Sequence, residues 1–209
     1  MARGPAFVEP SKMVRMAVSS MTEAGMAEEA QRVFRLDNEV LAFRFTATVS
    51  DRRGATPYER LGDPGRLALW LRSAGLDVGG ASLSDLNDAL ELREAIYRIG
   101  KAIATARQPD PEDVRTLNAA AAAGRAVAIL DGDVMRWHLT ETAPVRDALG
   151  VLATDAIRVF GASERDRVKC CEGPECAGLF LDTSRGANRR WCSMNTCGNK
   201  AKKSRLTAR

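Results

Sequence analysis

The spacing of the cysteines constrains this chain more than any other feature. All five lie between Cys170 and Cys197, and four of them form two pairs with matched gaps, Cys171-x4-Cys176 and Cys192-x4-Cys197. Two close cysteine pairs separated by about fifteen residues are typical of a structural zinc site, where each pair folds back to place two thiolates on one ion. We therefore predict one structural Zn²⁺ bound by Cys171, Cys176, Cys192 and Cys197.

Cys170 is the surplus thiol. Using Cys170 in place of Cys171 would give a five-residue gap and lose the match between the pairs, so Cys171 is the preferred ligand. The alternative for all five, buried apolar thiols, fits poorly with two matched pairs in one short segment. Four thiolates fill a tetrahedral zinc site and leave no position for water, so we expect a structural ion and no enzyme activity.

The charge is distributed unevenly along the chain. From Asp166 onward there are ten Lys or Arg residues and four Asp or Glu residues, although the whole chain carries a net charge of only +4. No acidic residue follows Asp182. Such an asymmetry favours an anionic partner for the basic end, and the alternative is a solvated basic tail.

The chain before the cysteines predicts several helices and two hairpins. One hairpin is expected over residues 33–49, and a second over residues 126–139, where Asp131-Gly132-Asp133 separates two apolar runs. Helices are predicted to begin after N-cap residues Asp63, Ser82 and Asp110, and at about Pro144. Because strands and helices do not alternate, we predict an α+β domain in which helices pack on a small antiparallel sheet.

Three regions are expected. Residues 1–31 form a flexible leader, residues 32–164 form the α+β domain, and residues 165–209 form a zinc finger with a basic tail. No apolar run approaches the roughly eighteen residues of a membrane-spanning helix. Charged residues interrupt the N-terminus, which is unlike a secretory signal, so we expect a cytoplasmic protein without a membrane partner.

The second cysteine pair lies in a recognisable motif. Residues 189–200 read Arg-Arg-Trp-Cys-Ser-Met-x-x-Cys-Gly-Asn-Lys, which closely resembles the signature of the CGNR zinc finger, with Lys200 where arginine is usual. Residues 41–49, the helix containing Trp70 and the second hairpin resemble more loosely the ABATE domain that precedes this finger. The resemblance implies a small treble-clef-like finger and a stress-related bacterial transcription regulator that binds DNA.

The finger is expected to present one basic surface. Lysines and arginines there would contact phosphates, and the asparagines and the Arg189–Arg190 pair have the chemistry to read base edges. At position 200, lysine keeps the charge of arginine but loses its planar fork. Trp191 is expected to pack over the zinc site or to stack on a base. The candidate nucleic-acid-binding residues are Arg185, Arg189, Arg190, Asn195, Asn199, Lys200, Lys202, Lys203 and Arg205.

The N-terminal domain shows no evident active site. His138 is the only histidine and lies in a predicted strand, so we expect a structural role for it. A domain paired with a nucleic-acid module is expected to sense a small-molecule effector, whose identity the sequence leaves open, or to form a homodimer. Two alternatives remain for the finger, namely a zinc-stabilised protein–protein interaction module and an RNA binder, both without sequence-specific DNA binding.

Overall fold

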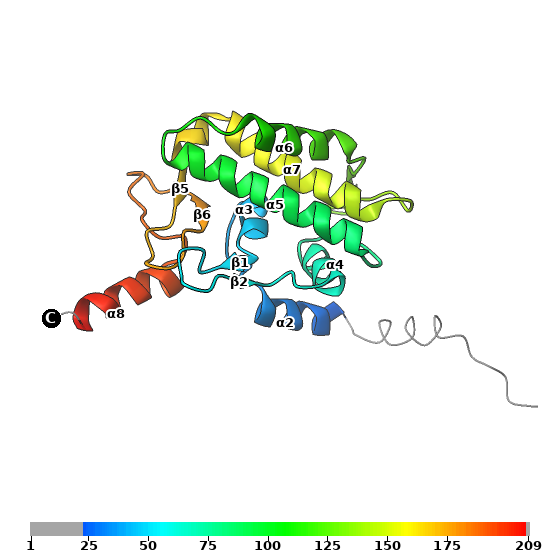
Figure 1. The fold of residues 1–209 in the computed structure, drawn as a ribbon. Helices are drawn as coiled ribbons and strands as arrows, with labels where there is room; N and C mark the ends of the chain where they lie inside the picture. Colours follow the sequence, from blue (N-terminus) through cyan, green and yellow to red (C-terminus); the bar gives the residue numbers. More distant parts are fainter. Residues whose placement is uncertain (1–22, 208–209) are drawn as a thin grey trace, which may run out of the picture.

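A computed structural model describes residues 23–207 of the chain (Figure 1). Most of the predicted flexible leader, residues 1–22, lies outside the described residues. The end of the predicted leader belongs to helix α2 (Glu23–Val33), which packs against α4 (Pro64–Ser73). Ala30 is fully buried there, so this part of the leader is a packed helix.

The described part of the chain is mostly helical, with small antiparallel two-stranded sheets, and the predicted α+β class is confirmed. The strand pairs do not join into the one sheet that was predicted, because each forms a separate two-stranded sheet. None of the described helices is both long and apolar enough to cross a membrane. The other helices are α3 (Leu41–Thr46), α5 (Leu83–Ala104), α6 (Pro111–Ala123), α7 (Pro144–Gly161) and α8 (Asn199–Thr207). The strand pairs are β1 (Val49–Ser50) with β2 (Tyr58–Glu59), β3 (Val127–Asp131) with β4 (Val134–His138), and β5 (Val168–Cys170) with β6 (Leu179–Leu181).

The first predicted hairpin, over residues 33–49, is wrong. Its apolar run forms helix α3, in which Ala42, Phe43 and Phe45 are all buried. A short continuous apolar run does not separate strand from helix by periodicity, so the tertiary environment decides. Here the carboxylate of Asp155 on α7 accepts a hydrogen bond of 2.8 Å from the backbone N–H of Ala42, which satisfies a donor that the first turn of a helix leaves free.

The predicted helix starts and the second hairpin are confirmed. Asp63 accepts a hydrogen bond from the backbone N–H of Arg66, and Ser82 and Asp85 form a capping box at the start of α5. The β3–β4 hairpin turns at Gly132, whose φ of +62° favours glycine. His138 is exposed on this hairpin, so it is not part of the core.

Helix α5 lies at the centre of the helical domain. It contacts α3, α4, α6 and α7, and also strand β5 of the cysteine-rich segment (Figure 1). Leu179 of β6 lies so close to α5 that a Cβ atom at Gly100 would fall 2.4 Å from its Cδ1. Val168 and Leu179 belong to the same apolar core as Trp70 and Ile96. The C-terminal finger is therefore docked on the helical domain through a shared core.

Candidate metal centre

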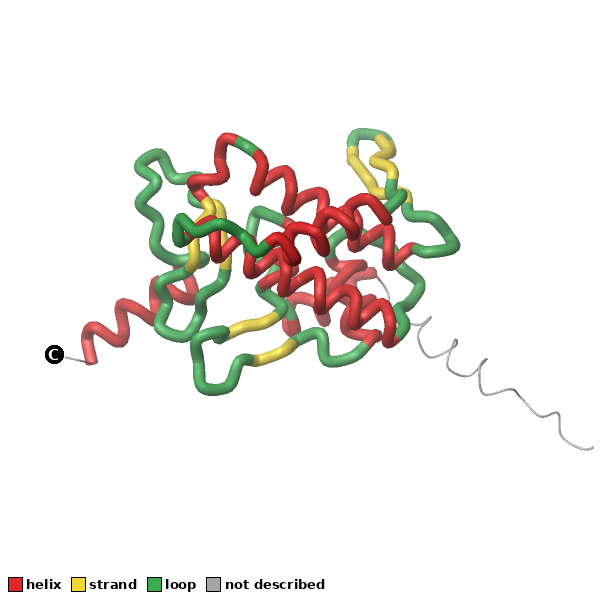
Figure 2. The backbone as a smooth tube through the Cα atoms, turned by 45° about the horizontal axis from the view of Figure 1, so that its top comes forward, coloured by secondary structure: helices red, strands yellow, loops and turns green. Residues whose placement is uncertain are grey.

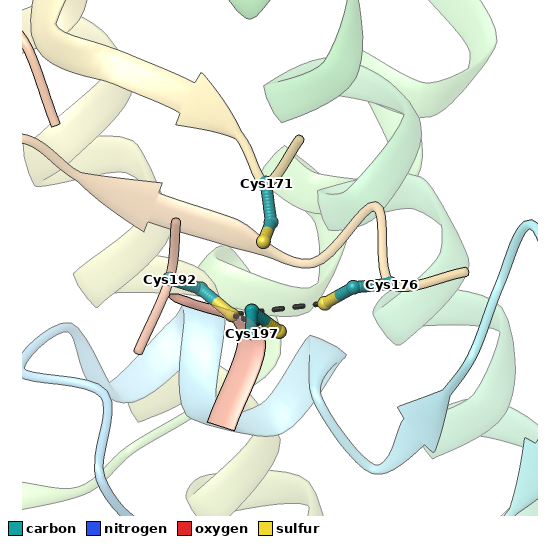
Figure 3. A group of neighbouring side chains, drawn as sticks. All are labelled: Cys171, Cys176, Cys192 and Cys197. Carbon is teal, nitrogen blue, oxygen red and sulfur yellow. Dashed lines mark hydrogen bonds between the residues drawn. The ribbon is translucent and has the colours of Figure 1, made fainter. Parts of the chain in front are cut away.

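The four predicted zinc ligands come together at one point. The sulfur atoms of Cys171, Cys176, Cys192 and Cys197 all lie within 4.8 Å of one another. Figure 3 shows their side chains pointing toward a common centre. Two of the sulfur–sulfur distances are 3.6 and 3.7 Å. Sulfurs bound to one zinc ion at about 2.3 Å in a tetrahedron stand about 3.8 Å apart, so the arrangement fits zinc.

Each ligand pair is positioned by a different local structure. Cys171 follows β5 directly, and Cys176 lies in the loop that leads to β6. Cys197 lies in a single π-helical turn, η2 (Met194–Gly198), which runs into α8. The finger thus consists of a strand pair with a ligand loop, followed by a ligand-bearing turn that leads into a helix.

The strand pair of the finger is β5 with β6, and Arg190–Trp191 forms no strand beside β6. The Arg190 carbonyl accepts a single hydrogen bond of 2.9 Å from the N–H of Glu172. Strand β6 pairs with β5 and not with the segment at Arg190, because Val168 of β5 lies in the shared core beside α5, whereas Arg190 is exposed.

Hydrogen-bond donors surround the sulfurs. The backbone N–H groups of Gly173 and Gly178 each donate to the sulfur two residues earlier, Cys171 and Cys176 respectively, at 3.4 Å. Such donors stabilise thiolate charge and orient the ligand side chains. The two glycines allow the backbone to pass close to the sulfurs, since a Cβ at Gly173 would lie 3.2 Å from the Cβ of Cys176.

The thiols compete for ionisation in the absence of a cation. Hydrogen bonding with Cys176 lowers the pKa of the Cys171 thiol to about 7. Hydrogen bonds with the surrounding sulfurs, Cys171 first, raise the pKa of the Cys192 thiol. Four adjacent thiolates therefore need a compensating positive charge, and a divalent ion supplies it when it replaces their protons. One zinc ion bound by these four residues would supply the folding free energy that this small segment lacks.

Cys170 lies apart from the cluster. It packs against the main core, and its thiol lines a separate cavity beside Tyr97 and Lys101. Burial raises the pKa of the Cys170 thiol. The structure thus selects Cys171 over Cys170, as the matched gaps predicted.

Arg35 of the helical domain lies beside the metal centre. The guanidinium of Arg35 donates to the hydroxyl of Thr196 at 2.8 Å and lies 3.9 Å from the sulfur of Cys192. Burial disfavours the charge of Arg35, but the neighbouring thiols, Cys192 first, outweigh burial and raise its pKa. A cation at this position offsets part of the −2 net charge that one zinc ion and four thiolates carry together.

A loop between β1 and β2 also holds the finger. Arg53 in this loop donates to the carbonyl of Cys171, and its backbone N–H donates to the carbonyl of Glu175. Two ion pairs join this hairpin to α5, Arg52 of the loop with Glu94 at 2.8 Å and Glu59 of β2 with Arg93 at 2.7 Å. Helix α5 therefore positions the first ligand loop both through Leu179 and through this loop.

Asp182 organises the loop between the ligand pairs. Its carboxylate is fully buried and accepts hydrogen bonds from Lys169, from both the backbone N–H and the hydroxyl of Ser184, and from the N–H of Arg189. Burial opposes ionisation of Asp182, but these donors, Lys169 first, outweigh burial and hold its pKa below the usual range. The loop that carries Arg185 to Arg190 is thereby fixed around one carboxylate.

The candidate nucleic-acid-binding residues fall into two groups. Helix α8 carries the C-terminal group and projects away from the helical body (Figure 1). The other group lies in the loop between the ligand pairs and in the turn η2. Exposed side chains are those of Arg185, Arg190, Asn195, Asn199, Lys200, Lys202 and Lys203. The side chain of Arg205 lies outside the described part of the chain.

Arg189 and Arg190 have partners within the finger. Arg189 is half-buried, donates to the carbonyls of Trp191 and Cys192, and stacks over the ring of Phe180. Arg190 forms an ion pair with Glu172. Trp191 packs against the cluster of Cys171, Phe180 and Cys197, as the packing alternative predicted. Arg185, Lys200 and Lys202 therefore present exposed positive charge, whereas Arg189 and Arg190 are held by partners within the finger.

Several residues that contact the finger could not be predicted from the sequence. Arg35, Asn38, Arg53 and Tyr97 all hydrogen-bond to the finger from more than 75 residues away in sequence, as the separations of 157, 141, 118 and 80 show. No local pattern marks such contacts. The burial of Asp182 likewise depends on Lys169 and Arg189 folding around it.

A helical domain docked on a closed four-cysteine centre defines a small zinc-finger protein. The ABATE family, described as a putative stress-induced transcription regulator, matches residues 39–163, and the CGNR zinc finger matches residues 167–209. Because the first match covers more than half of the chain, this protein belongs to the ABATE family. The order of domains confirms the resemblance seen in the sequence. No curated protein matches the chain.

Proposed function

We propose that this protein is a cytoplasmic transcription regulator that contacts DNA through its zinc finger, while the N-terminal domain senses a small ligand or brings two copies together. The observation that carries the DNA proposal is helix α8. It begins two residues after the zinc ligand Cys197, projects from the helical domain, and carries Lys200, Lys202 and Lys203 without an acidic residue (Figure 1). A protruding basic helix has the dimensions and charge to enter a DNA groove.

The role of zinc in this proposal is structural. Four thiolates fill the coordination shell, so the ion fixes the direction in which α8 leaves the finger and takes no part in a reaction. We infer on the same ground that the protein is not an enzyme. The contacts of Arg35 and Arg53 hold the metal centre on the helical domain, so that the direction of α8 is also set relative to α5.

The test uses the full, zinc-loaded chain and fluorescence anisotropy with a labelled random DNA duplex. The double variant Lys200→Gln with Lys202→Gln is expected to weaken binding roughly ten-fold at low salt and to reduce the slope of log affinity against log salt by about 2. The matched control, Arg115→Gln with Arg146→Gln, removes the same charge from α6 and α7, on the other side of the body (Figure 1).

The control is expected to bind as the wild type does. Equal loss of affinity in both double variants would show a nonspecific charge effect and overturn the assignment to α8. Competition with a single-stranded RNA of equal length separates the RNA alternative. A chain that binds neither nucleic acid leaves the protein-interaction module as the function of the finger.

The sensing role is supported by a cavity of about 470 Å³ between the two domains. Arg35 and Arg60 of the helical domain and Lys200 of α8 line it, together with Asp51 and Glu175. The zinc ligands Cys176 and Cys197 also line it, so this cavity borders the metal centre. Its size suits a small organic ligand, and a ligand there would touch both the domain and the start of α8. Succinate, an anion that binds zinc only weakly, is a suitable probe. We expect it to raise the melting temperature of the wild type and to have less effect on Arg60→Gln, and an equal effect on both proteins would count against this cavity as the binding site.

A further inference from the structure

A second cavity lies where the β1–β2 loop, helix α5 and the finger meet. Its volume is about 420 Å³, which suits a small organic molecule. The β1–β2 loop lies beside the finger in both views of the backbone (Figure 1 and Figure 2). Helix α5 lines the cavity with Tyr97 and Lys101, which are four residues apart and so share one face of the helix. The finger contributes Cys170 and Ala177.

The charged residues that line the described part of this cavity are all basic, namely Arg52, Arg53 and Lys101. The side chain of Arg52 is only 10% exposed, and its charge is balanced by the ion pair with Glu94. Arg53 and Lys101 are exposed, and the acceptor that Arg53 contacts is a backbone carbonyl without net charge. The wall therefore carries an excess of positive charge, and a cleft lined by one sign of charge attracts ligands of the opposite sign.

Much of the remaining wall is apolar. Val49, Pro57 and Ala177 line it together with Tyr97. The hydroxyl of Tyr97 donates to the carbonyl of Ala177 at 3.2 Å, and the guanidinium of Arg52 stacks over the ring at 3.8 Å. Since these contacts already fix Tyr97, a ligand does not have to order this part of the wall. A pocket with an apolar side and a few placed charges matches a molecule with an apolar body and one anionic end.

The cavity connects the helical domain to the finger. Cys170 and Ala177 in its wall are immediate neighbours of the zinc ligands Cys171 and Cys176. Among the described lining residues, this cavity shares none with the cavity beside Arg60. A ligand here would contact both parts of the protein at once. It would therefore stabilise the arrangement in which the finger is docked on α5.

We propose that this second cavity is a binding site for a small organic anion with an apolar body. The anionic group is held by Lys101 and Arg53, and the apolar body packs against Tyr97 and Val49. The inference goes beyond the proposed function, because it depends neither on DNA binding nor on a ligand in the cavity beside Arg60. For a ligand as small as benzoate, the dissociation constant is expected to be on the order of 1 mM.

The test is isothermal titration calorimetry of the full, zinc-loaded chain with benzoate. Lys101→Gln is expected to raise the dissociation constant roughly ten-fold, because the carboxylate loses a charged hydrogen-bond donor. The matched control, Arg115→Gln, removes the same charge from an exposed position on α6 and is expected to bind as the wild type does. A wild type that binds no benzoate up to about 20 mM overturns the proposal, and so does equal weakening in the two variants.

Three comparisons test the chemistry and the place of binding. Benzamide carries the ring without the charge, and acetate carries the charge without the ring, so both are expected to bind at least roughly ten-fold more weakly than benzoate. Equal binding of either compound would overturn the proposed ligand class. Arg60→Gln is expected to bind benzoate as the wild type does. Weaker binding in Arg60→Gln than in Lys101→Gln would place benzoate in the other cavity and overturn the assignment.

Cys170 offers a readout that needs no variant. When four of the five cysteines bind zinc, Cys170 is the one that the ion does not hold. Its alkylation by N-ethylmaleimide, followed by mass spectrometry of the zinc-loaded wild type, is expected to slow several-fold in saturating benzoate, because the ligand covers the thiol in the cavity wall. Benzamide at the same concentration is expected to leave the rate unchanged. A rate that saturating benzoate does not alter overturns the proposal.

Discussion

Arg35 donates a hydrogen bond of 2.8 Å to the hydroxyl of Thr196, across 161 residues of sequence. Thr196 precedes the zinc ligand Cys197, and the same guanidinium faces the sulfur of Cys192. One side chain of the helical domain therefore touches the second ligand pair and the turn from which α8 begins. The metal centre and the contact between the finger and the segment that follows α2 are thus physically linked.

Arg35→Gln is expected to release zinc faster. The variant removes a positive charge beside four thiolates, so the centre holds its ion less tightly, and we expect a rate of transfer to a colorimetric zinc chelator on the order of ten-fold higher. Arg32→Gln is the control, since Arg32 is exposed on α2 and forms an ion pair with Glu28 of the same helix. Equal release rates from the two variants would show that Arg35 does not support the metal centre.

Replacing Cys171 and replacing Cys170 are expected to have opposite outcomes. Cys171→Ser removes one of the four converging sulfurs, so zinc content should fall well below one ion per chain. Cys170→Ser leaves the cluster intact and should keep one ion. Elemental analysis of both proteins, purified without chelators, measures this directly. Full zinc content in Cys171→Ser, with loss in Cys170→Ser, would reverse the ligand assignment.

Asp182→Asn is expected to lower the free energy of unfolding by about 2 kcal/mol near neutral pH, because the carboxylate accepts charge-assisted hydrogen bonds in a buried position. The pKa of Asp182 is depressed in the folded state, so its contribution is fully present above the ordinary value of 3.8 and is lost as the pH falls through the lower folded pKa. Denaturant titrations should show a constant difference between variant and wild type from about pH 5 to 7, and a shrinking one below about pH 4.

The matched variant for this comparison is Asp77→Asn, because Asp77 is exposed. It should stay close to the wild type at every pH. A deficit in Asp182→Asn that grows on acidification would contradict the sign of the pKa shift.

Gly150→Ala is expected to destabilise the crossing of α6 and α7. A Cβ at this position would lie 2.6 Å from the Cα of Gly124, and a backbone atom cannot rotate away as a side chain can. We expect a loss of about 2 kcal/mol in the free energy of unfolding. Gly161→Ala, in the same helix and with no atom within 4 Å of the added Cβ, is the control. Thermal melts of the two variants measure the difference in stability. Equal melting temperatures would show that Gly150 and Gly124 do not approach each other as closely as the structure places them.

The sequence by itself determined the zinc ligands and most of the helices. Cysteine pairs with matched gaps need only the chain to fold back locally on one ion, and a cap such as Asp63 or Ser82 acts within three residues of its helix. Such short-range rules can be read from a linear pattern.

Only the tertiary structure decided where the apolar run at Ala42 and Phe43 would go, which strand β6 would pair with, and how the finger would sit. Those outcomes depend on partners such as Asp155, Val168 and Arg35, which are distant in sequence and leave no local periodicity. The exposure of Leu130 belongs to the same class, because a hydrophobic strand pattern predicts burial, and only the position of the core shows that the tip of the hairpin extends beyond it.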